Sequence, residues 1–341
     1  MIPFIINIIY LFIKIRYKIK KTEEPPLNLR KSFLKLYKYG LPFSVKDFGD
    51  ILVRELYTQS VGIFESPEIV TGYNIGINFS NVGSYSINSF GHPLSVSFTR
   101  LYAIKKIDEV VKIYQTLFHY ILFIVLIISG FLFFVIDFFL FLIYGETYLD
   151  FSLILKIMII SIIFNIQNLF FYGLIRATNK GKKIIPIYLL LVPLKIVCFI
   201  IIIMYFGIIS ALISLMILNF IYFIALLILS YKIFKIKTNV IKVLFQYISF
   251  FVSLGITILL NYAFLNNLNN ILLNLIHLSY FKYLNIFSIL VFCFSYIILN
   301  FIFKIITKKD LNNIELLLEK KNFVFKLVKK ALNLFKKLVR D

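Results

Sequence analysis

The chain has 341 residues, of which 60% are hydrophobic and only 16% are charged, and its mean hydropathy is +0.91. Soluble proteins are nearer half apolar and a quarter charged, so this composition excludes a soluble enzyme, a secreted disulfide scaffold and a disordered chain. The net charge of +21 does not indicate nucleic-acid binding, because the basic residues lie in short stretches between apolar runs, as in cytoplasmic membrane loops. The sequence therefore predicts an all-α, polytopic transmembrane helix bundle.

Apolar runs long enough to cross a bilayer, about 20 residues each, recur along the chain. The segments that qualify are 43–64, 69–95, 116–143, 151–175, 184–206, 208–230, 243–263 and 280–304. A shorter run, 2–15, is interpreted as the end of a helix that begins before Met1. The connections alternate between basic and non-basic, as the positive-inside rule requires. The pattern predicts a multi-pass protein of the cell membrane with a cytoplasmic C-terminus.

Two basic amphipathic stretches, 28–39 and 311–341, are expected on the cytoplasmic side. In each, apolar residues recur at helical spacing among lysines. A basic amphipathic helix beside a membrane span is typical of contact with anionic membrane lipids. Binding of a partner protein is the alternative interpretation.

The first full span carries charged residues on one face. Asp47, Asp50 and Arg54, with Thr58, fall within an arc of about 80° at 100° per residue. Such charges can pair at helical spacing. They indicate either an ion-pair cluster that holds the helix in its bundle or the polar wall of a substrate path.

The second span has a polar face opposite a row of glycines. The polar face consists of Asn74, Asn78, Asn81, Tyr85, Asn88 and His92, and the opposite face contains Gly72, Gly76 and Gly83. Polar residues within a membrane usually face a wet interior, while small residues allow close helix contact. The pattern predicts a water-accessible asparagine face and a tightly packed glycine face.

Further polar residues lie in the two spans 151–175 and 184–206. One face holds Ser161, Asn165, Asn168 and Tyr172 and ends at Arg176. Lys156 lies on the other side near the outer end, where we expect its side chain to snorkel to the surface. Lys195 lies near the bilayer centre beside Pro193. We expect Lys195 to point into a cavity or to pair with an acid such as Asp137.

Cations dominate these polar faces at Arg54, Arg176 and Lys195, although only six of the 37 basic residues are Arg. Asn and Tyr suit sugars, whereas Arg and Lys suit phosphate. The residues alone thus indicate a transporter or lipid-handling protein with a cationic polar cavity. No metal-ligand spacing, phosphate loop, dinucleotide fingerprint or nucleophile motif appears in the sequence, so we predict no catalytic residue, metal or cofactor. Cys198 and Cys293 are interpreted as small buried hydrophobes.

Short motifs in a fixed order carry a family resemblance over about residues 35–320. They are Leu41-Pro42-Phe43, Val61-Gly62, Gly72-Tyr73, Pro93, Tyr144-Gly145 with Tyr148, the hairpin from Arg176 to Lys182, Tyr205-Phe206-Gly207-Ile208 with Ala211, and the run from Thr307 to Leu311. In these motifs the chain resembles the C-terminal half of Wzx-type oligosaccharide flippases of the multidrug/oligosaccharidyl-lipid/polysaccharide exporter superfamily.

The resemblance implies the second lobe of a two-lobe, alternating-access flippase fold. It divides the chain into a preceding helix end and basic loop (1–40), a six-helix lobe (41–230), an extra helix pair (231–306) and a cytoplasmic amphipathic tail (307–341). The implied substrate is an oligosaccharide linked through phosphate or pyrophosphate to a polyprenyl lipid. By the same implication Arg54, Arg176 and Lys195 hold the phosphate, while Asp47, Asp50, Asn74, Asn78, Asn81, Asn88, Asn165 and Asn168 line the sugar path.

Alternatives from other classes remain open at this stage. A multidrug-type cation exporter of the same superfamily is the runner-up, and an integral-membrane glycosyltransferase or polysaccharide polymerase is a third interpretation. A purely structural membrane subunit is a fourth. Because most of the first lobe has no counterpart here, we expect either a separately encoded N-terminal lobe, a second copy of the chain, or residues that precede Met1 to complete the transporter.

Overall fold

The computed structural model describes residues 29–183, 185–236, 238–262, 285–303 and 305. Their regular structure is helical, with no strand in these ranges, which confirms the predicted all-α bundle. The chain divides into two compact units, Met1–Phe48 and Gly49–Asp341. The predicted domain boundaries stay predictions, and the run 2–15 and the tail 311–341 lie outside the described residues.

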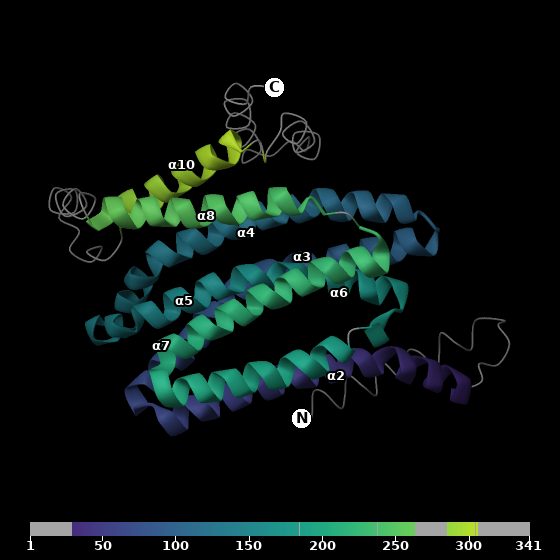
Figure 1. Cartoon of the computed structure of the whole chain (residues 1–341), viewed down its shortest axis with the longest axis horizontal. Helices are drawn as coiled ribbons and strands as arrows, with labels where there is room; N and C mark the ends of the chain where they lie inside the picture. The colour runs from purple at the N-terminus through teal and green to yellow at the C-terminus, as the bar shows by residue number, and fades with distance from the viewer. Residues whose placement is uncertain (1–28, 184, 237, 263–284, 304, 306–341) are drawn as a thin grey trace, which may run out of the picture. The chain divides into compact units, whose positions relative to one another are not determined.

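The described part of the first unit is the beginning of α2, and the second unit consists of long helices joined by short connections (Figure 1). In chain order they are α2 (Leu29–Phe64), α3 (Pro67–Ala103), α4 (Ile107–Tyr144), the 3-10 turn η1 (Glu146–Phe151), α5 (Ser152–Ile162), η2 (Ile163–Asn165), α6 (Ile166–Thr178), η3 (Gly181–Lys183), α7 (Ile185–Phe234), α8 (Val240–Leu260) and α10 (Ile286–Ile302). The stretch expected to be a separate amphipathic segment, from residue 29 on, is the beginning of α2. Its Phe33 and Leu36 side chains are exposed.

Four helical stretches of the described chain are long and apolar enough to cross a membrane: Ile107–Tyr144, Glu146–Thr178, Gly181–Phe234 and Val240–Leu260. Helix α10 is apolar but has only 17 residues. The predicted spans 43–64 and 69–95 are helical, as parts of α2 and α3, yet they are not among these four. Charged side chains in α2 and the many Gly, Asn and Ser residues of α3 lower their hydropathy.

Helix α7 contains two of the predicted spans, because it is a helical hairpin that reverses at Gly207 (Figure 1). Gly207 has φ 75° and ψ 177°, a conformation that a side chain at this position would strain. The reversal falls at the Phe206-Gly207 turn that the sequence indicated. Two apolar helices of this length therefore need no additional connecting residues.

Helix α3 packs along α5 and α6 through the predicted glycine row. A Cβ atom on Gly72 would lie 2.4 Å from the Phe151 ring, and one on Gly76 would lie 2.4 Å from the Met158 sulfur. Near the other end the roles reverse, since Phe98 of α3 lies against Gly173 of α6. The contacts advance in the same direction along both segments, so α3 runs parallel to α5–α6. Such close approach is what small residues allow between membrane helices.

The C-terminal helices α8 and α10 pack against α4. Phe292 of α10 lies so close to Gly130 of α4 that a Cβ atom there would be 1.9 Å from its ring. Phe250 of α8 and Phe292 are both fully buried and their ring centroids lie 5.9 Å apart. This aromatic packing fixes the helix pair on the rest of the second unit.

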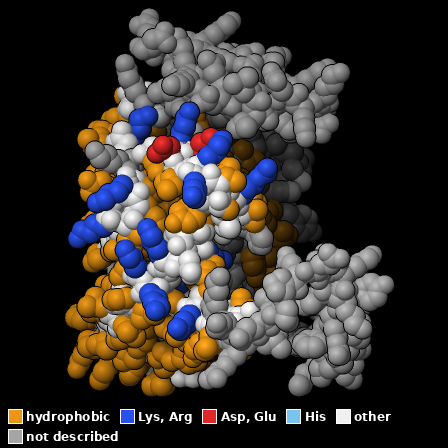
Figure 2. Space-filling model, turned by 90° about the vertical axis from the view of Figure 1, so that its right-hand side faces the viewer, with side chains coloured by type: hydrophobic (Ala, Val, Ile, Leu, Met, Phe, Trp, Pro, Cys, Tyr) orange, Lys and Arg blue, Asp and Glu red, His pale blue; other side chains and the backbone are white. Residues whose placement is uncertain are grey.

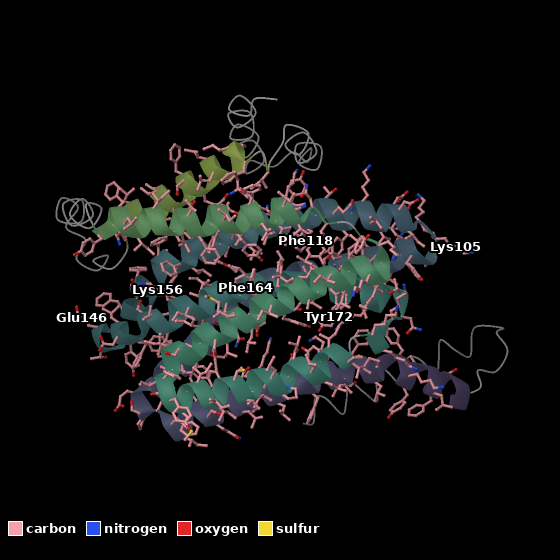
Figure 3. The ribbon with its side chains drawn as sticks, in the orientation of Figure 1. Lys105, Phe118, Glu146, Lys156, Phe164 and Tyr172 are labelled. Carbon is pink, nitrogen blue, oxygen red and sulfur yellow. The ribbon has the colours of Figure 1, made fainter. Side chains whose placement is uncertain are left out.

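Basic and acidic connections lie at opposite ends of the helices. Lys105, between α3 and α4, lies at one end, and Glu146, between α4 and α5, lies at the other (Figure 3). Figure 2 looks onto the end that holds Lys105, where Lys and Arg side chains gather and acidic side chains are few. Such separation is what the positive-inside rule produces in a membrane protein.

Candidate functional site

Lys195 is hydrogen-bonded inside the second unit to a neutral side chain. Its Nζ atom donates to Oδ1 of Asn219 at 2.7 Å, and Nδ2 of Asn219 donates to Oγ of Ser161 at 2.9 Å. Lys195 lies before Gly207 and Asn219 after it, while Ser161 lies in α5. The chain of hydrogen bonds thus joins both halves of the α7 hairpin to α5.

A group of three buried tyrosines begins beside this lysine. The Lys195 ammonium lies 5.0 Å from the centroid of the Tyr222 ring, a distance typical of a cation–π contact. The hydroxyls of Tyr222 and Tyr172 share a hydrogen bond of 2.7 Å. The ring of Tyr188 lies edge-on to Tyr222, with centroids 6.5 Å apart. All three rings are at most 9% exposed, so the lysine has a polar yet largely dry surrounding.

A carboxylate from α2 completes the arrangement. The hydroxyl of Tyr188 donates to the carboxylate of Asp50, and this carboxylate acts electrostatically on Lys195. We refer to the whole set as the Lys195 cluster. It consists of Asp50, Ser161, Tyr172, Tyr188, Lys195, Asn219 and Tyr222.

Helical spacing explains why these residues meet. Tyr188 and Lys195 are seven residues apart and therefore lie on one face of the first half of α7. Asn219 and Tyr222 are three residues apart and share a face of the second half. Ser161 and Tyr172 contact Asn219 and Tyr222 in turn, which keeps the predicted polar face of 151–175 directed at α7. The hairpin turn at Gly207 brings the face that carries Lys195 and the face that carries Asn219 together.

The other two predicted cations have different surroundings. Arg54 forms an ion pair of 3.6 Å with the neighbouring Glu55, and its side chain is 56% exposed. Arg176 is exposed in the last turn of α6. Asp47 belongs to the first unit and pairs with Lys46 at 3.4 Å. Of the charged residues predicted to bind substrate, Asp50 and Lys195 are the two that the structure brings into one cluster.

The predicted asparagines fall into two groups. Asn74, Asn78 and Asn81 are exposed on α3, opposite its buried glycines, and the side chain of Asn88 lies outside the described residues. Asn165 and Asn168 are half-buried at the junction of α5 and α6, where Nδ2 of Asn168 donates to Oδ1 of Asn165 at 3.4 Å. Oδ1 of Asn168 is buried without a hydrogen-bond partner among the described residues. This oxygen can accept a hydrogen bond from a ligand hydroxyl.

Of the two alternatives for Lys195, pairing with Asp137 is wrong, and the interpretation that Lys195 points into a cavity stays a prediction. Asp137 does not pair with Lys195, because its carboxylate accepts hydrogen bonds from Lys156, at 2.7 Å, and from Ser152. The Lys156 ammonium is held by this ion pair between α4 and α5, and the Phe133 ring lies 5.6 Å away. The expectation that Lys156 snorkels stays a prediction. The mutual attraction of the Asp137 and Lys156 charges, which sequence spacing does not reveal, holds these two side chains together.

Sequence reasoning missed Tyr188, Asn219 and Tyr222. A signal for two of them was present, since Asn219 and Tyr222 are one helical turn apart in an otherwise apolar run. A second buried network was also missed. Nε2 of Gln167 donates to the Tyr114 hydroxyl at 2.7 Å and to Oγ of Ser230 at 3.0 Å. This network joins α4, α6 and α7 through neutral side chains.

Within the described residues, no group of His, Cys, Asp and Glu side chains is arranged to hold a metal ion. Cys198 and Cys293 are free thiols and half-buried. The chemistry of the Lys195 cluster therefore rests on one ammonium, one carboxylate, phenol hydroxyls and neutral hydrogen-bonding groups.

A family model described as MatE matches residues 51–201. The match includes α3 to α6, the first half of α7 and, of the Lys195 cluster, Ser161, Tyr172, Tyr188 and Lys195. No curated protein and no solved structure matches the chain. MatE proteins are membrane transporters of the multidrug/oligosaccharidyl-lipid/polysaccharide exporter superfamily. The match supports this superfamily and supports transport as the general function.

Proposed function

We propose that the chain forms one lobe of a flippase that moves polyprenyl-phosphate- or polyprenyl-pyrophosphate-linked oligosaccharides across the cell membrane, with Lys195 binding the phosphate. The observation that carries this proposal is that a largely buried ammonium donates to a neutral amide. An arriving phosphate oxygen can replace Asn219 as acceptor and form a stronger, charge-assisted hydrogen bond. Arg54 and Arg176, which lie outside the Lys195 cluster, attract the anionic headgroup along its path.

The sugar chain would follow the amide and phenol groups. Asn168 offers a buried acceptor, Asn165 lies beside it, and Tyr172 continues the same side of α6 toward the Lys195 cluster. Sugars present many hydroxyls and apolar ring faces, which suit amides and aromatic rings respectively. The exposed Asn74, Asn78 and Asn81 offer further amide groups on the face of α3 opposite its glycines.

The decisive experiment measures glycan export in cells that lack their own flippase for lipid-linked oligosaccharides. Cells that express the chain, together with any companion lobe, are stained for surface glycan, and membrane insertion is measured on the same cells. We expect Lys195→Ala to reduce export about 10- to 150-fold, which corresponds to loss of a charged hydrogen bond of about 1.5–3 kcal/mol. Lys195→Arg should retain part of the export.

The matched control removes a different lysine from the same bundle. Asp137→Asn/Lys156→Met deletes an ion pair within α4 and α5 and leaves every member of the Lys195 cluster in place. Export should stay near the wild-type level in this double variant. Normal export by Lys195→Ala at equal membrane abundance would disprove the role of Lys195.

An organic-cation exporter is the second candidate, because Asp50 and three tyrosine rings lie in the same cluster. Carboxylates and aromatic faces attract organic cations. In that case Lys195 repels the substrate, and Lys195→Ala should raise efflux of a dye such as ethidium while Asp50→Asn abolishes it. An export defect in glycan together with unchanged dye efflux selects the flippase.

A second lobe is proposed to cover the exposed asparagine face of α3, since polar groups that face lipid are costly. A separately encoded lobe and a second copy of this chain are the candidates. We also propose that the basic end of the helices faces the cytoplasm. Cysteine introduced at Asn78 should be protected from a lipid-soluble thiol reagent when the companion lobe is present. Equal labelling of the chain alone and of the assembled complex would exclude this interface.

A further inference from the structure

The helix between residues 152 and 178 is interrupted between the polar residues Ser161 and Asn168. Helix α5 ends at Ile162, the 3-10 turn η2 occupies Ile163–Asn165, and α6 begins at Ile166. The interruption contains neither Pro nor Gly, the usual causes of a break. A short 3-10 stretch within a long helix has weaker hydrogen-bond geometry and often marks a hinge, so a stabilising partner from outside the helix is needed.

That partner is Tyr247 of α8. Its hydroxyl donates to the main-chain carbonyl of Ile163 at 3.0 Å. Its ring stacks on Phe164 with centroids 5.5 Å apart and meets Phe223 edge-on at 5.4 Å. Tyr247 is only 5% exposed. A side chain that bonds to a carbonyl inside a helix is one of the few recognised causes of a local break.

Helix α8 can hold this contact because it is itself anchored to α4. Next to Tyr247, Nε2 of Gln246 donates to the carbonyl of His119 at 3.0 Å, and the two side chains also contact each other at 3.3 Å. Phe292 of α10 lies on Gly130 of α4. The helix pair therefore transmits the position of α4 to the break through one tyrosine.

We infer that Tyr247 is a positioning residue, which holds the α5–α6 break so that Ser161 and Asn168 stay aimed at the substrate path. Ser161 lies two residues before the break and holds Asn219 of the Lys195 cluster. Gln167, just after the break, is fixed by Tyr114 and Ser230. The transport part of this inference rests on the proposed function, whereas the hinge part does not. Helix α8 and Tyr247 lie outside the segment matched by the MatE family model.

The test is Tyr247→Phe in the full-length chain, examined by hydrogen–deuterium exchange of the purified protein in lipid nanodiscs. The ring and its contacts with Phe164 and Phe223 remain, and only the hydroxyl is lost. Amides of residues 161–169 should exchange about three- to tenfold faster, the factor that matches loss of one hydrogen bond. Exchange in α4 and α8 should stay unchanged, because the packing of the helix pair is intact.

The matched control is Tyr296→Phe, which removes a hydroxyl from a fully buried tyrosine in the same helix pair. The Tyr296 ring packs against Phe123 of α4 and Phe250 of α8, so exchange at 161–169 should not change. Equal exchange of Tyr247→Phe and wild type across 161–169 would overturn the hinge. Faster exchange across the whole chain would show general destabilisation and would overturn it as well.

A second measurement reads the position of the break directly. In a background with Cys198→Ala and Cys293→Ala, Asn165→Cys should react severalfold faster with an aqueous maleimide when Tyr247→Phe is added. Asn74→Cys, on the exposed face of α3, should react at one rate in both backgrounds. If the wild-type chain fails to export glycan but these exchange and labelling results hold, the flippase proposal is wrong and the hinge stands. If the wild-type chain exports glycan but these exchange and labelling results fail, the hinge is wrong and the flippase proposal stands.

Discussion

Two lysines of the apolar bundle, Lys156 and Lys195, differ in what holds them. Lys156 donates to the carboxylate of Asp137, and the two side chains are 21% and 33% exposed. Lys195 donates to the neutral amide of Asn219 and lies over the Tyr222 ring. Residue type and hydropathy are the same at the two positions, so their partners make the difference.

The comparison separates a charge that is satisfied by an ion pair from the charge that we propose binds the substrate. An ion pair at short range satisfies both of its members, and removing one leaves the other uncompensated. An ammonium whose hydrogen-bond acceptor is a neutral amide can form a stronger, charge-assisted hydrogen bond when an anion arrives. Charged residues inside membrane bundles usually mark substrate or ion paths, and here that inference applies to Lys195 rather than to Lys156.

The largest expected effect on stability follows from breaking the Asp137–Lys156 pair on one side. Asp137→Ala should lower the free energy of unfolding by about 2–4 kcal/mol, below the upper range for buried pairs because both side chains keep some exposure. Unfolding by sodium dodecyl sulfate, followed by far-UV circular dichroism, measures the loss. Asp137→Asn/Lys156→Met should restore most of it. A single variant as stable as wild type would contradict the structural role.

The next effect concerns the close contact of α3 with the chain just before α5. Helix α5 carries both Lys156, which contacts α4, and Ser161, which contacts α7. Gly72 allows α3 to approach η1, the turn that leads into α5, because a Cβ atom there would lie 2.4 Å from the Phe151 ring. Gly72→Ala should cost about 1–3 kcal/mol, the usual range for overpacking. Gly62→Ala is the control: it lies within α2 and its Cβ atom would meet nothing within 4 Å. This control should stabilise the protein slightly, and a similar loss in both variants would exclude the close contact.

The sequence predicts those features of the bundle that follow from residue spacing within one helix. It does not predict those that follow from contacts between helices. The two faces of α3 follow from periodicity alone, since glycine and asparagine positions repeat at helical spacing and the structure buries Gly72, Gly76 and Gly83. The reversal at Phe206-Gly207 follows from a glycine between two apolar runs. Both features are local, so neither needs knowledge of which helices touch.

Pairing between helices is what the sequence did not provide. Lys156 and Lys195 both have Asp137 as an available acid, and only the packing of α5 on α4 decides between them. The break at Ile163–Asn165 has no local signal, because its cause is a tyrosine about 80 residues away in sequence. The Tyr188–Asp50 and Asn219–Ser161 contacts likewise join segments that only the fold brings together.

A smaller effect on the free energy of unfolding is expected for the tyrosines beside Lys195. Tyr172→Phe removes one side of the 2.7 Å hydrogen bond to Tyr222 and should cost about 0.5–1.5 kcal/mol. Tyr172→Phe/Tyr222→Phe removes both hydroxyls of this hydrogen bond, so its cost should be less than the sum of the two single variants. Detergent unfolding of the four proteins completes the double-mutant cycle. Strict additivity would show that the two hydroxyls do not interact.

The smallest effect on stability is expected for Lys195 itself. Lys195→Met should change the free energy of unfolding by less than about 1 kcal/mol, because burying an ammonium is costly and its replacement by an apolar side chain of similar length recovers that cost. Oδ1 of Asn219 loses its donor, but Nδ2 of Asn219 keeps its hydrogen bond to Ser161 and Asp50 keeps the one from Tyr188. The measurement is the same detergent unfolding used for Asp137→Ala. A loss as large as that of Asp137→Ala would mean that Lys195 holds the bundle together as Lys156 does. A near-zero change combined with lost export would mean that the ammonium is kept for its ligand at no benefit to the fold.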